Sequence, residues 1–240
     1  MARTAVVTGG TRGIGAAVCV ALKDAGYQVA ATYFGNEERA KSFSDDTGIP
    51  TFKFDVGDFE QCAAGVAKIV DKLGPIDVLV NNAGITRDGV MQKMTHENWQ
   101  KVLDTNLGGC FNMCHEVLVS MRERGFGRIV NIGSINGQAG QYGQVNYAAA
   151  KSGIHGFTKA LAQEGAAKGI TVNAIAPGYI DTDMVSAVPD RVLEKIVARI
   201  PVGRLGKAHE IARAVLFLVE DDAAFITGST LSINGGQHMY

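Results

Sequence analysis

The chain alternates short runs of β-branched and other apolar residues with longer amphipathic segments along almost its whole length. The apolar runs have the length of single strands, and the segments between them have the length of helices. Nearly continuous apolar strands joined by helices predict a parallel sheet covered on both faces, since parallel strands need right-handed crossover connections. We therefore expect an α/β fold, a Rossmann-type doubly wound parallel sheet of about seven strands, in a single domain over residues 1–240.

The expected strands are the runs "TAVVTG", "QVAATYF", "TFKFDV", "IDVLVNNAG", "GRIVNIGS", "ITVNAIAPG" and "TLSING". The expected helices cover residues 14–25, 59–73, 97–122, 147–168 and 208–219. The segment 179–202 departs from the alternation, because it starts with polar residues and contains Pro189 and Pro201. We expect this segment to form a flap over a binding site.

Charge and hydropathy limit the kinds of partner. A formal net charge of −1, without a run of like charges, gives no electrostatic attraction to nucleic acid or to an anionic membrane. No apolar run approaches the ~18 residues that cross a membrane, and "MARTAVVTGG" leads straight into a strand pattern without a signal peptide. The sequence predicts a cytoplasmic protein that acts on small molecules.

The cysteines and histidines give no sign of redox or metal chemistry. The four cysteines form no C-x-x-C pair, and Cys110 and Cys114 lie at helical spacing in an apolar stretch, so we expect buried free thiols. The five histidines are scattered singly, without a second ligand at metal-binding spacing. We expect no metal site.

The glycine-rich stretch "TGGTRGIG", residues 8–15, follows the first expected strand and opens the first helix. Backbone N–H groups and the positive end of the helix converge there, which favours an anion. We expect Gly9 to allow the tight turn, Gly13 to let the backbone approach a pyrophosphate, and Gly15 to allow close packing of helix on strand. Such turns also serve packing alone, but this position at the first strand–helix junction favours a dinucleotide.

A tyrosine and a lysine in "NYAAAK" predict an acid–base site. Tyr147 and Lys151 are four residues apart on a helix that we expect to open at Asn146, so their side chains share one face. We expect Lys151 and the positive helix end to lower the pKa of the Tyr147 phenol, so that it exchanges a proton with an alkoxide. Ser134 follows a strand, where its hydroxyl can hydrogen-bond a carbonyl oxygen. The alternatives are a tyrosine in the core, a lysine on a solvated face and a serine that only binds a strand end.

The end of the second expected strand indicates which dinucleotide is bound. Sites for NAD carry a carboxylate there for the ribose 2′-hydroxyl, but this strand ends with Tyr33, Phe34 and Gly35. Arg12 and Arg39 can instead clamp a 2′-phosphate. We therefore expect NADPH/NADP+, the alternative being that both arginines are solvated surface charges.

Six segments resemble, in order and spacing, the motifs of the short-chain dehydrogenase/reductase family. They are "TGGTRGIG", "NNAG", "DTNLGG", "NIGS", "NYAAAK" and "PGYIDTDM", and the resemblance runs from Thr8 to the carboxy terminus. It implies a catalytic set of Asn106, Ser134, Tyr147 and Lys151, in which Asn106 anchors a water chain and Lys151 also holds the nicotinamide ribose. Asn106 could alternatively be a simple hydrogen-bonding residue at the end of a structural element.

With the glycine turn and the two arginines, the resemblance implies an extended dinucleotide site. Its residues would be Gly9, Thr11, Arg12, Gly13, Ile14, Gly15, Gly35, Arg39, Asp55, Val56, Asn82, Ala83, Gly84, Ile85, Thr86, Tyr147, Lys151, Pro177, Gly178, Tyr179, Ile180 and Thr182. A catalytically idle dinucleotide-binding redox sensor is the alternative from a different class, and the intact catalytic set argues against it.

Within the family, "GITRDGVMQKMT", "NGQAGQYGQVNYAAAK" and "INGGQHMY" resemble the acetoacetyl-CoA reductases of polyhydroxybutyrate synthesis, and the 3-oxoacyl-carrier-protein reductases are nearly as similar. The resemblance implies reduction of acetoacetyl-CoA to (R)-3-hydroxybutyryl-CoA by a homotetramer, with helices 97–122 and 147–168 at its interface. The expected substrate contacts are Asp88, Ser134, Gln141, Tyr142, Gly143, Gln144 and Tyr179. Tyr142 is equally a candidate packing aromatic.

The surface charges bear on the carrier of the acyl group. Acyl carrier protein is acidic and needs a basic docking patch, whereas CoA needs only a few cations. In the flap, Arg191, Lys195 and Arg199 are offset by Asp181, Asp183, Asp190 and Glu194. We therefore expect CoA, but a second patch of Arg122, Arg124 and Arg128 keeps the carrier-protein alternative open.

Overall fold

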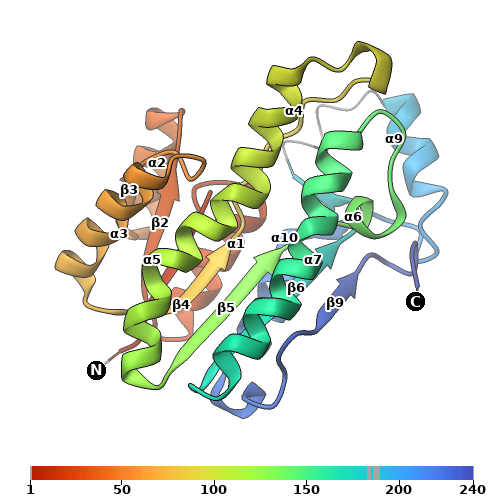
Figure 1. The fold of residues 1–240 in the computed structure, drawn as a ribbon. Helices are drawn as coiled ribbons and strands as arrows, with labels where there is room; N and C mark the ends of the chain where they lie inside the picture. Colours follow the sequence, from red (N-terminus) through yellow and green to blue (C-terminus); the bar gives the residue numbers. More distant parts are fainter. Residues whose placement is uncertain (1, 183–184, 186–189, 240) are drawn as a thin grey trace.

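In the computed structural model, which describes residues 2–182, 185 and 190–239, seven strands of the described residues form one parallel sheet (Figure 1). The order is β3-β2-β1-β4-β5-β6-β9, and every neighbouring pair is parallel. The strands are β1 (Thr4–Val7), β2 (Gln28–Tyr33), β3 (Thr51–Lys53), β4 (Ile76–Asn81), β5 (Gly127–Ile132), β6 (Ile170–Pro177) and β9 (Thr230–Ile233). The predicted seven-stranded parallel sheet is confirmed.

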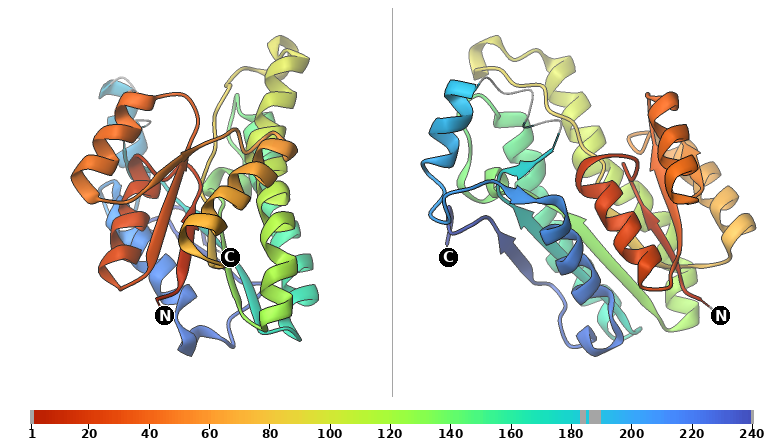
Figure 2. Two further views of the ribbon diagram at one scale, coloured as in Figure 1. Left: turned by 90° about the vertical axis from the view of Figure 1, so that its left-hand side faces the viewer. Right: turned by 180° about the vertical axis from the view of Figure 1, so that it is seen from behind.

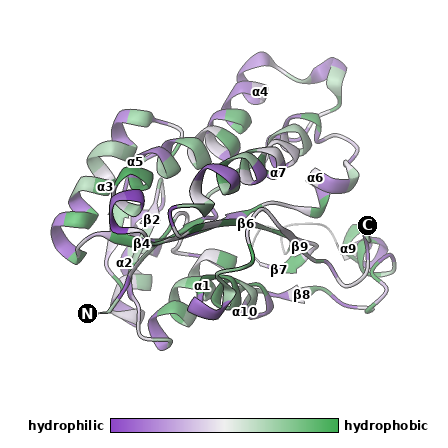
Figure 3. Cartoon of the chain, turned by 60° about the horizontal axis from the view of Figure 1, so that its bottom comes forward, coloured by the Kyte–Doolittle hydropathy of each residue, from purple (hydrophilic) through white to green (hydrophobic). Residues whose placement is uncertain are grey.

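Helices cover both faces of the sheet (Figure 3). One face carries α1 (Gly13–Asp24), α2 (Glu37–Thr47) and α10 (Ala208–Val219), and the other carries α3 (Phe59–Leu73), α5 (Gly109–Arg124) and α7 (Val145–Ala166). Helices α1 and α10, far apart in the sequence, lie side by side (Figure 2). The predicted doubly wound arrangement is confirmed.

The period-two alternation of the strands divides the core into two layers. On β1, Ala5 and Val7 face the α1–α10 layer, whereas Val6 faces the layer of α3 and α5. All three side chains are fully buried. Because both faces of a central parallel strand are covered, its residues are apolar throughout, and this is the pattern that identified the strands in the sequence.

The order of the strands places the site. The chain winds outward from β1 in one direction through β2 and β3, and in the other from β4 to β9. Because all these strands are parallel, their carboxyl ends lie along one edge of the sheet. The loops after β1 and β4 diverge at the point where the winding reverses, and this opens a crevice at that edge.

One predicted helix contains a π-helical turn. The segment expected as a single helix over 97–122 forms α4 (His96–Leu103), a π-helical turn (Asp104–Gly108) and α5. Gly109 begins α5 against Val56, whose Cγ2 atom would lie 2.8 Å from a β-carbon on this glycine. The predicted helix is therefore present over its whole length, but its hydrogen-bonding pattern changes to that of a π-helix at Asn106.

The remaining described elements are short. They are α6 (Ile135–Ala139), α9 (Asp190–Val197), 3₁₀ turns at Met91–Lys93 and Asp221–Ala223, and a two-stranded sheet of β7 (Ile180–Asp181) and β8 (Gly206–Lys207). Of the predicted flap 179–202, residues 183–184 and 186–189 lie outside the described part of the chain.

The cysteines are buried and free, as predicted. Within the described residues, no helix is both long and apolar enough to cross a membrane. The same part of the chain holds no group of three His, Cys, Asp or Glu side chains that suits a metal ion.

Candidate active site

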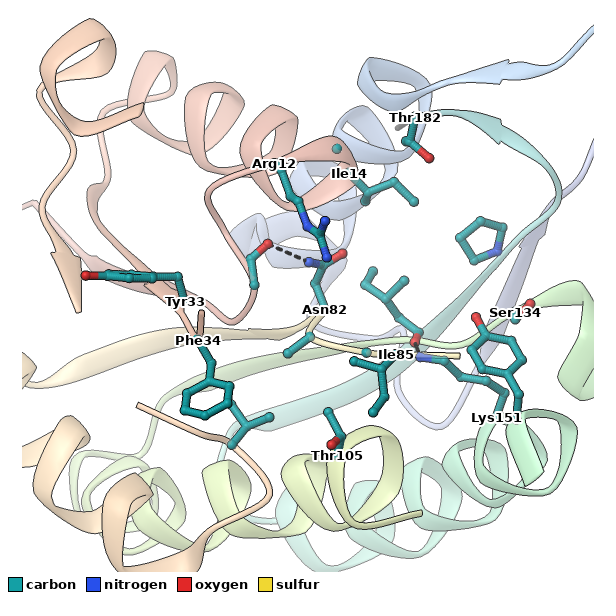
Figure 4. Close-up of a pocket in the computed structure, with 18 of the residues that line it drawn as sticks. Arg12, Ile14, Tyr33, Phe34, Asn82, Ile85, Thr105, Ser134, Lys151 and Thr182 are labelled. Atoms are coloured by element: carbon teal, nitrogen blue, oxygen red, sulfur yellow. Dashed lines mark hydrogen bonds between the residues drawn. The ribbon is translucent and has the colours of Figure 1, made fainter. Parts of the chain in front are cut away.

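A cavity of about 400 Å³ opens at the carboxyl ends of β1, β4, β5 and β6. Figure 4 shows Tyr33 and Phe34 at one end of it and Ser134 and Lys151 at the other. The predicted site residues that line it are Gly9, Thr11, Arg12, Gly13, Ile14, Asp55, Val56, Asn82, Ala83, Gly84, Ile85, Ser134, Tyr147, Lys151, Pro177, Gly178, Ile180 and Thr182. Residues from the two halves of the sequence therefore meet in one elongated site.

The glycine turn joins β1 to α1 on the wall of this cavity. Gly9 and Gly13 have φ of +60° and +52°, a left-handed backbone conformation that residues other than glycine rarely adopt. Arg12 precedes α1 in extended conformation and makes no side-chain capping bond, so the first amides of the helix stay open. This is a ready anion site.

Gly15 packs against the turn itself. A β-carbon there would collide with the Gly9 carbonyl oxygen and lie 2.6 Å from Nδ2 of Asn82. The predicted close packing at Gly15 is present, but Gly15 packs against the glycine turn and not against the strand. The reason is that the turn folds back over the first residues of the helix.

Asn82 fastens the end of β4 to the glycine turn. Its side-chain amide donates to the carbonyl oxygens of Thr8 at 2.9 Å and Gly9 at 3.1 Å. The Thr8 hydroxyl in return accepts from the amides of Asn82 and Ala83, both at 3.0 Å. These bonds hold together the two loops that form the crevice.

The opposite end of the cavity holds the acid–base residues. Tyr147 and Lys151 lie one turn apart on α7, with the ammonium 5.7 Å from the centre of the phenol ring. Lys151 is buried and donates to the carbonyl oxygen of Ile132 at 2.7 Å. Ser134 follows β5 and hydrogen-bonds the Tyr147 side chain. The fold thus brings the serine, tyrosine and lysine into one site.

The electrostatics of this group differ from the prediction. Burial raises the pKa of Tyr147, and the hydrogen bond from Ser134 only partly opposes this shift. Burial also lowers the pKa of Lys151, which weakens it as a cation. The prediction that Lys151 lowers the phenol pKa is wrong for this structure, because desolvation is the main influence on both groups and Lys151 is not among the groups that act on the pKa of Tyr147. A raised pKa keeps Tyr147 protonated, which suits a proton donor.

Asn106 lies in the π-helical turn and is fully buried. Its Nδ2 atom donates to the carbonyl oxygen of Ile85 at 2.9 Å, and its Oδ1 atom accepts from the Ile85 amide at 2.7 Å. A β-carbon on Gly84 would approach this Oδ1 atom to 3.1 Å and the Lys151 ammonium to 3.6 Å. Both ends of the Asn106 side chain are therefore occupied with the loop after β4, and Asn106 does not line the cavity.

The cavity is also lined by residues that the sequence did not predict for the site. They are Thr32, Tyr33, Phe34, Phe54, Arg87, Lys101, Thr105, Ile132, Gly133 and Val185. Lys101 forms an ion pair of 3.1 Å with the carboxylate of Asp55, the residue expected beside the adenine. Tyr33 ends β2 and Phe34 follows it, and that position alone could have identified them.

Other predicted dinucleotide contacts do not line the cavity. They are Gly15, Gly35, Arg39, Thr86 and Tyr179. Tyr179 lines a second, smaller cavity of about 120 Å³, which also contains Arg204 and Glu210. Gly178 and Ile180 line both cavities, whereas Tyr179 lines only the smaller one.

The structure fits a nicotinamide dinucleotide. The open amides of α1 can take a pyrophosphate. Gly13, in left-handed conformation, leaves room for the pyrophosphate to approach the backbone. Among the described residues, the one neighbour found there is Thr182, whose Cγ2 atom would lie 3.4 Å from a β-carbon on this glycine.

The predicted substrate contacts lie outside the main cavity, apart from Ser134. They are Asp88, Gln141, Tyr142, Gly143, Gln144 and Tyr179. Gln144 donates to the Asp88 carboxylate at 2.9 Å, so these two side chains hold each other. Tyr142 is 86% exposed, so the alternative of a packing aromatic is wrong within the single chain.

The predicted basic patch forms only in part. Arg128 is buried, with its guanidinium 4.5 Å from the centre of the Phe126 ring. Arg124 pairs with Asp77, and Arg122 donates to the carbonyl oxygen of Glu164 at 2.9 Å. These arginines lie at the amino ends of β4 and β5, the edge opposite the cavity in the same chain. The patch is smaller than predicted, because Arg128 is buried and Asp77 offsets Arg124, while Arg122 stays exposed.

The comparisons with known proteins agree with this site. A family model described as "Enoyl-(Acyl carrier protein) reductase" matches residues 9–238. The chain is 65% identical over 239 residues to the acetoacetyl-CoA reductase of Rhizobium meliloti strain 1021, and the match covers 99% of each chain. It is 64% identical over 238 residues to the acetoacetyl-CoA reductase of Shinella zoogloeoides, again over 99% of each.

A relative with a different substrate name is more distant. The chain is 41% identical over 244 residues to the 3-oxoacyl-[acyl-carrier-protein] reductase of Staphylococcus aureus strain Mu50, covering 100% of this chain and 99% of the relative. Because the match spans nearly the whole chain and the fold is the one that the motifs imply, the chain belongs to the short-chain dehydrogenase/reductase family of nicotinamide-dependent oxidoreductases.

Proposed function

We propose that this chain is an NADPH-dependent acetoacetyl-CoA reductase that forms (R)-3-hydroxybutyryl-CoA and supplies polyhydroxybutyrate synthesis. The observation that carries the proposal is that Ser134, Tyr147 and Lys151 line one end of a cavity whose wall also includes the glycine turn. The full-length identity of 65% to a protein named acetoacetyl-CoA reductase supports the choice of substrate.

The residues have distinct roles in this reaction. A bound NADPH supplies the hydride that reduces the 3-keto carbon. Ser134 donates a hydrogen bond to the keto oxygen, and Tyr147 gives that oxygen a proton as negative charge develops on it. Lys151 lies behind Tyr147 and holds the nicotinamide ribose, while Asn106 fixes the Gly84–Ile85 wall from behind.

The choice of NADPH rests on the end of the cavity near Tyr33. No carboxylate follows β2 there, and Arg12 is an exposed cation on the cavity wall. A 2′-phosphate would gain a charge-assisted bond from this guanidinium. Arg39 is also exposed, but it does not line the cavity, so we assign it the smaller part.

The 3-oxoacyl-[acyl-carrier-protein] reductase is the second candidate function, and the relative from Staphylococcus aureus supports it. The lower identity, the burial of Arg128 and the pairing of Arg124 with Asp77 weigh against it. In the flap, the described side chains of Arg191, Lys195 and Arg199 are exposed, beside the equally exposed Glu194. A surface with both positive and negative charges gives no net attraction for an acidic carrier protein.

The test measures NADPH oxidation with acetoacetyl-CoA and with the acetoacetyl group on acyl carrier protein, over a range of salt. We expect a higher kcat/KM for acetoacetyl-CoA and only a shallow fall with salt. A tenfold preference for the carrier protein at low salt, lost at high salt, would move the assignment to fatty acid synthesis. Tight NADPH binding without turnover of either thioester would support the redox sensor instead.

We further propose a cytoplasmic homotetramer. Phe111 and Val119 on α5 are 52% and 63% exposed, and Val145 at the start of α7 is 37% exposed. Exposed apolar side chains on these two helices suit a subunit interface. Sedimentation at micromolar concentration tests the tetramer.

A further inference from the structure

A short helix connects the serine to the rest of the site. Helix α6 begins directly after Ser134, and the Ser134 hydroxyl oxygen accepts a hydrogen bond of 3.1 Å from the Asn136 backbone amide. A hydroxyl has two acceptor positions and one proton. With an acceptor position taken by the helix, the proton of Ser134 remains available for the cavity.

The Asn136 side chain continues this connection to the helix that carries the tyrosine. Its Nδ2 atom donates to Oε1 of Gln144 at 2.9 Å. Gln144 is the residue that precedes α7, three positions before Tyr147, and its side chain makes no capping bond to that helix. Asn136 therefore contacts both the serine and the start of the tyrosine helix.

Gln144 is itself held on its other side. Its Nε2 atom donates to the Asp88 carboxylate at 2.9 Å. Because a carboxylate only accepts, Asp88 fixes which end of the Gln144 amide points toward it, and the carbonyl end is left for Asn136. The backbone supports the same contact, since the Gly89 amide donates to the Gly143 carbonyl oxygen at 2.8 Å.

A second contact fixes the angle between α6 and α7. The Ser152 hydroxyl donates to the Gly137 carbonyl oxygen, and a β-carbon on Gly137 would lie 2.6 Å from the carbonyl carbon of Lys151. Backbone contact at Gly137 and the side-chain bond from Asn136 to Gln144 attach the short helix at two points. Neither point alone would stop it from turning.

We propose that Asn136 is a positioning residue, which through its bonds to Ser134 and Gln144 sets the serine hydroxyl relative to the hydroxyl of Tyr147. The inference rests on the proposed carbonyl reduction, because the relative position matters only if both hydroxyls bind the same oxygen. Misplacement of a reacting group by about 1 Å can cost up to ~10²-fold in rate.

The first experiment compares Asn136→Ala with Gln138→Met on the same helix. Gln138 pairs with Ser232 at 2.9 Å and belongs to neither the cavity nor the connection to α7. We expect Asn136→Ala to lower kcat at least about tenfold, with the Kd for NADPH unchanged. The isotope effect on kcat with NADPH deuterated at the transferred position should rise, because chemistry becomes slower than product release. Gln138→Met should match the wild type.

The second experiment is a double-mutant cycle with Gln144→Met. If the two residues act through their shared bond, the double variant should lose no more activity than the worse single variant. Multiplication of the two losses would overturn the proposal, and so would a kcat for Asn136→Ala within twofold of wild type or an equal loss in Gln138→Met. Should Asn136→Ala not fold, as judged by thermal unfolding, Gln144→Met decides by the same criteria.

The inference and the proposed function fail separately. The variants are compared on whichever thioester the wild type reduces, so an error in the substrate leaves the ratio of rates meaningful. If the wild type reduces neither thioester, the pKa of the Tyr147 phenol is measured directly. The ultraviolet absorbance is followed over a range of pH, and the titration of Tyr147→Phe is subtracted. The hydrogen bond from Ser134 lowers the pKa of Tyr147, so loss of its positioning should raise that pKa in Asn136→Ala. An unchanged titration would then overturn the role of Asn136.

Discussion

The side chain of Asn106 makes both hydrogen bonds of the Ile85 backbone, donating to its carbonyl oxygen at 2.9 Å and accepting from its amide at 2.7 Å. The side-chain amide bonds the Ile85 backbone in the way that a neighbouring β-strand would. It therefore fixes a wall of the cavity and does not reach into the cavity. The water chain expected at Asn106 stays a prediction, and in this structure the side chain supports the cavity wall from behind.

Asn106→Leu should therefore reduce both stability and cofactor binding. Two backbone groups lose their partners, which should lower the free energy of unfolding by about 2–3 kcal/mol. The Gly84–Ile85 wall becomes loose, so the Kd for NADPH should rise. Urea unfolding and fluorescence titration measure the two effects.

Asn173→Leu is the matched control for that variant. Asn173 is equally buried and likewise bonds a loop with both ends of its side chain, to the Ile226 carbonyl oxygen and the Ser229 amide. It should lose similar stability but keep its affinity for NADPH. Equal loss of affinity in both variants would mean that the effect on binding is only a general loss of stability.

Tyr147→Phe should leave the fold and NADPH binding nearly intact while lowering turnover by at least ~10²-fold, since only the proton donor is removed. The rate of NADPH oxidation, measured together with the Kd for NADPH on the same preparation, checks this prediction. Turnover within threefold of wild type would remove Tyr147 from the mechanism.

Arg12→Asp should shift the preference from NADPH toward NADH more strongly than Arg39→Asp does. Only Arg12 lines the cavity, so a carboxylate there repels a 2′-phosphate directly. The measurement is the ratio of kcat/KM for the two cofactors. Arg213→Asp, on the exposed face of α10, controls for the change in net charge. A ratio that stays constant would show that another group recognises the phosphate.

Asp88→Asn should change the pH dependence of the reverse reaction. Asp88 and Tyr179 add to the effect of burial in raising the pKa of Tyr147, because nearby negative charge disfavours the phenolate. Asparagine removes the charge but can still accept from Gln144, so the phenol pKa should fall. Oxidation of 3-hydroxybutyryl-CoA needs the ionised phenol, and its rise in rate with pH should therefore move to lower pH.

The control for that shift is Asp24→Asn, at the exposed end of α1, which removes the same charge far from the cavity. It should keep the wild-type profile. A profile for Asp88→Asn that coincides with this control would contradict the electrostatic link between Asp88 and Tyr147.

The sequence predicted the sheet well because buried parallel strands are apolar on both faces, as Val6 and Val7 illustrate. It also predicted that Ser134, Tyr147 and Lys151 would meet, since each lies just beyond a strand end or on the helix that follows. It failed where distant neighbours decide. The burial of Arg128 beside Phe126, and the desolvation that shifts the pKa values of Tyr147 and Lys151, depend on packing that no local pattern contains.

The π-helical turn at Asp104–Gly108 has a consequence for how the long segment 96–124 is built. Each residue of a helix advances it by about 100°, so one deletion in this turn would rotate all of α5 by that angle relative to α4. Either Met113 and Met121 would leave the core, or Asn106 would lose Ile85. The π-helical turn rotates the buried face of α5 relative to that of α4. One continuous segment can therefore place Asn106 against the cavity wall and Met113 and Met121 in the core.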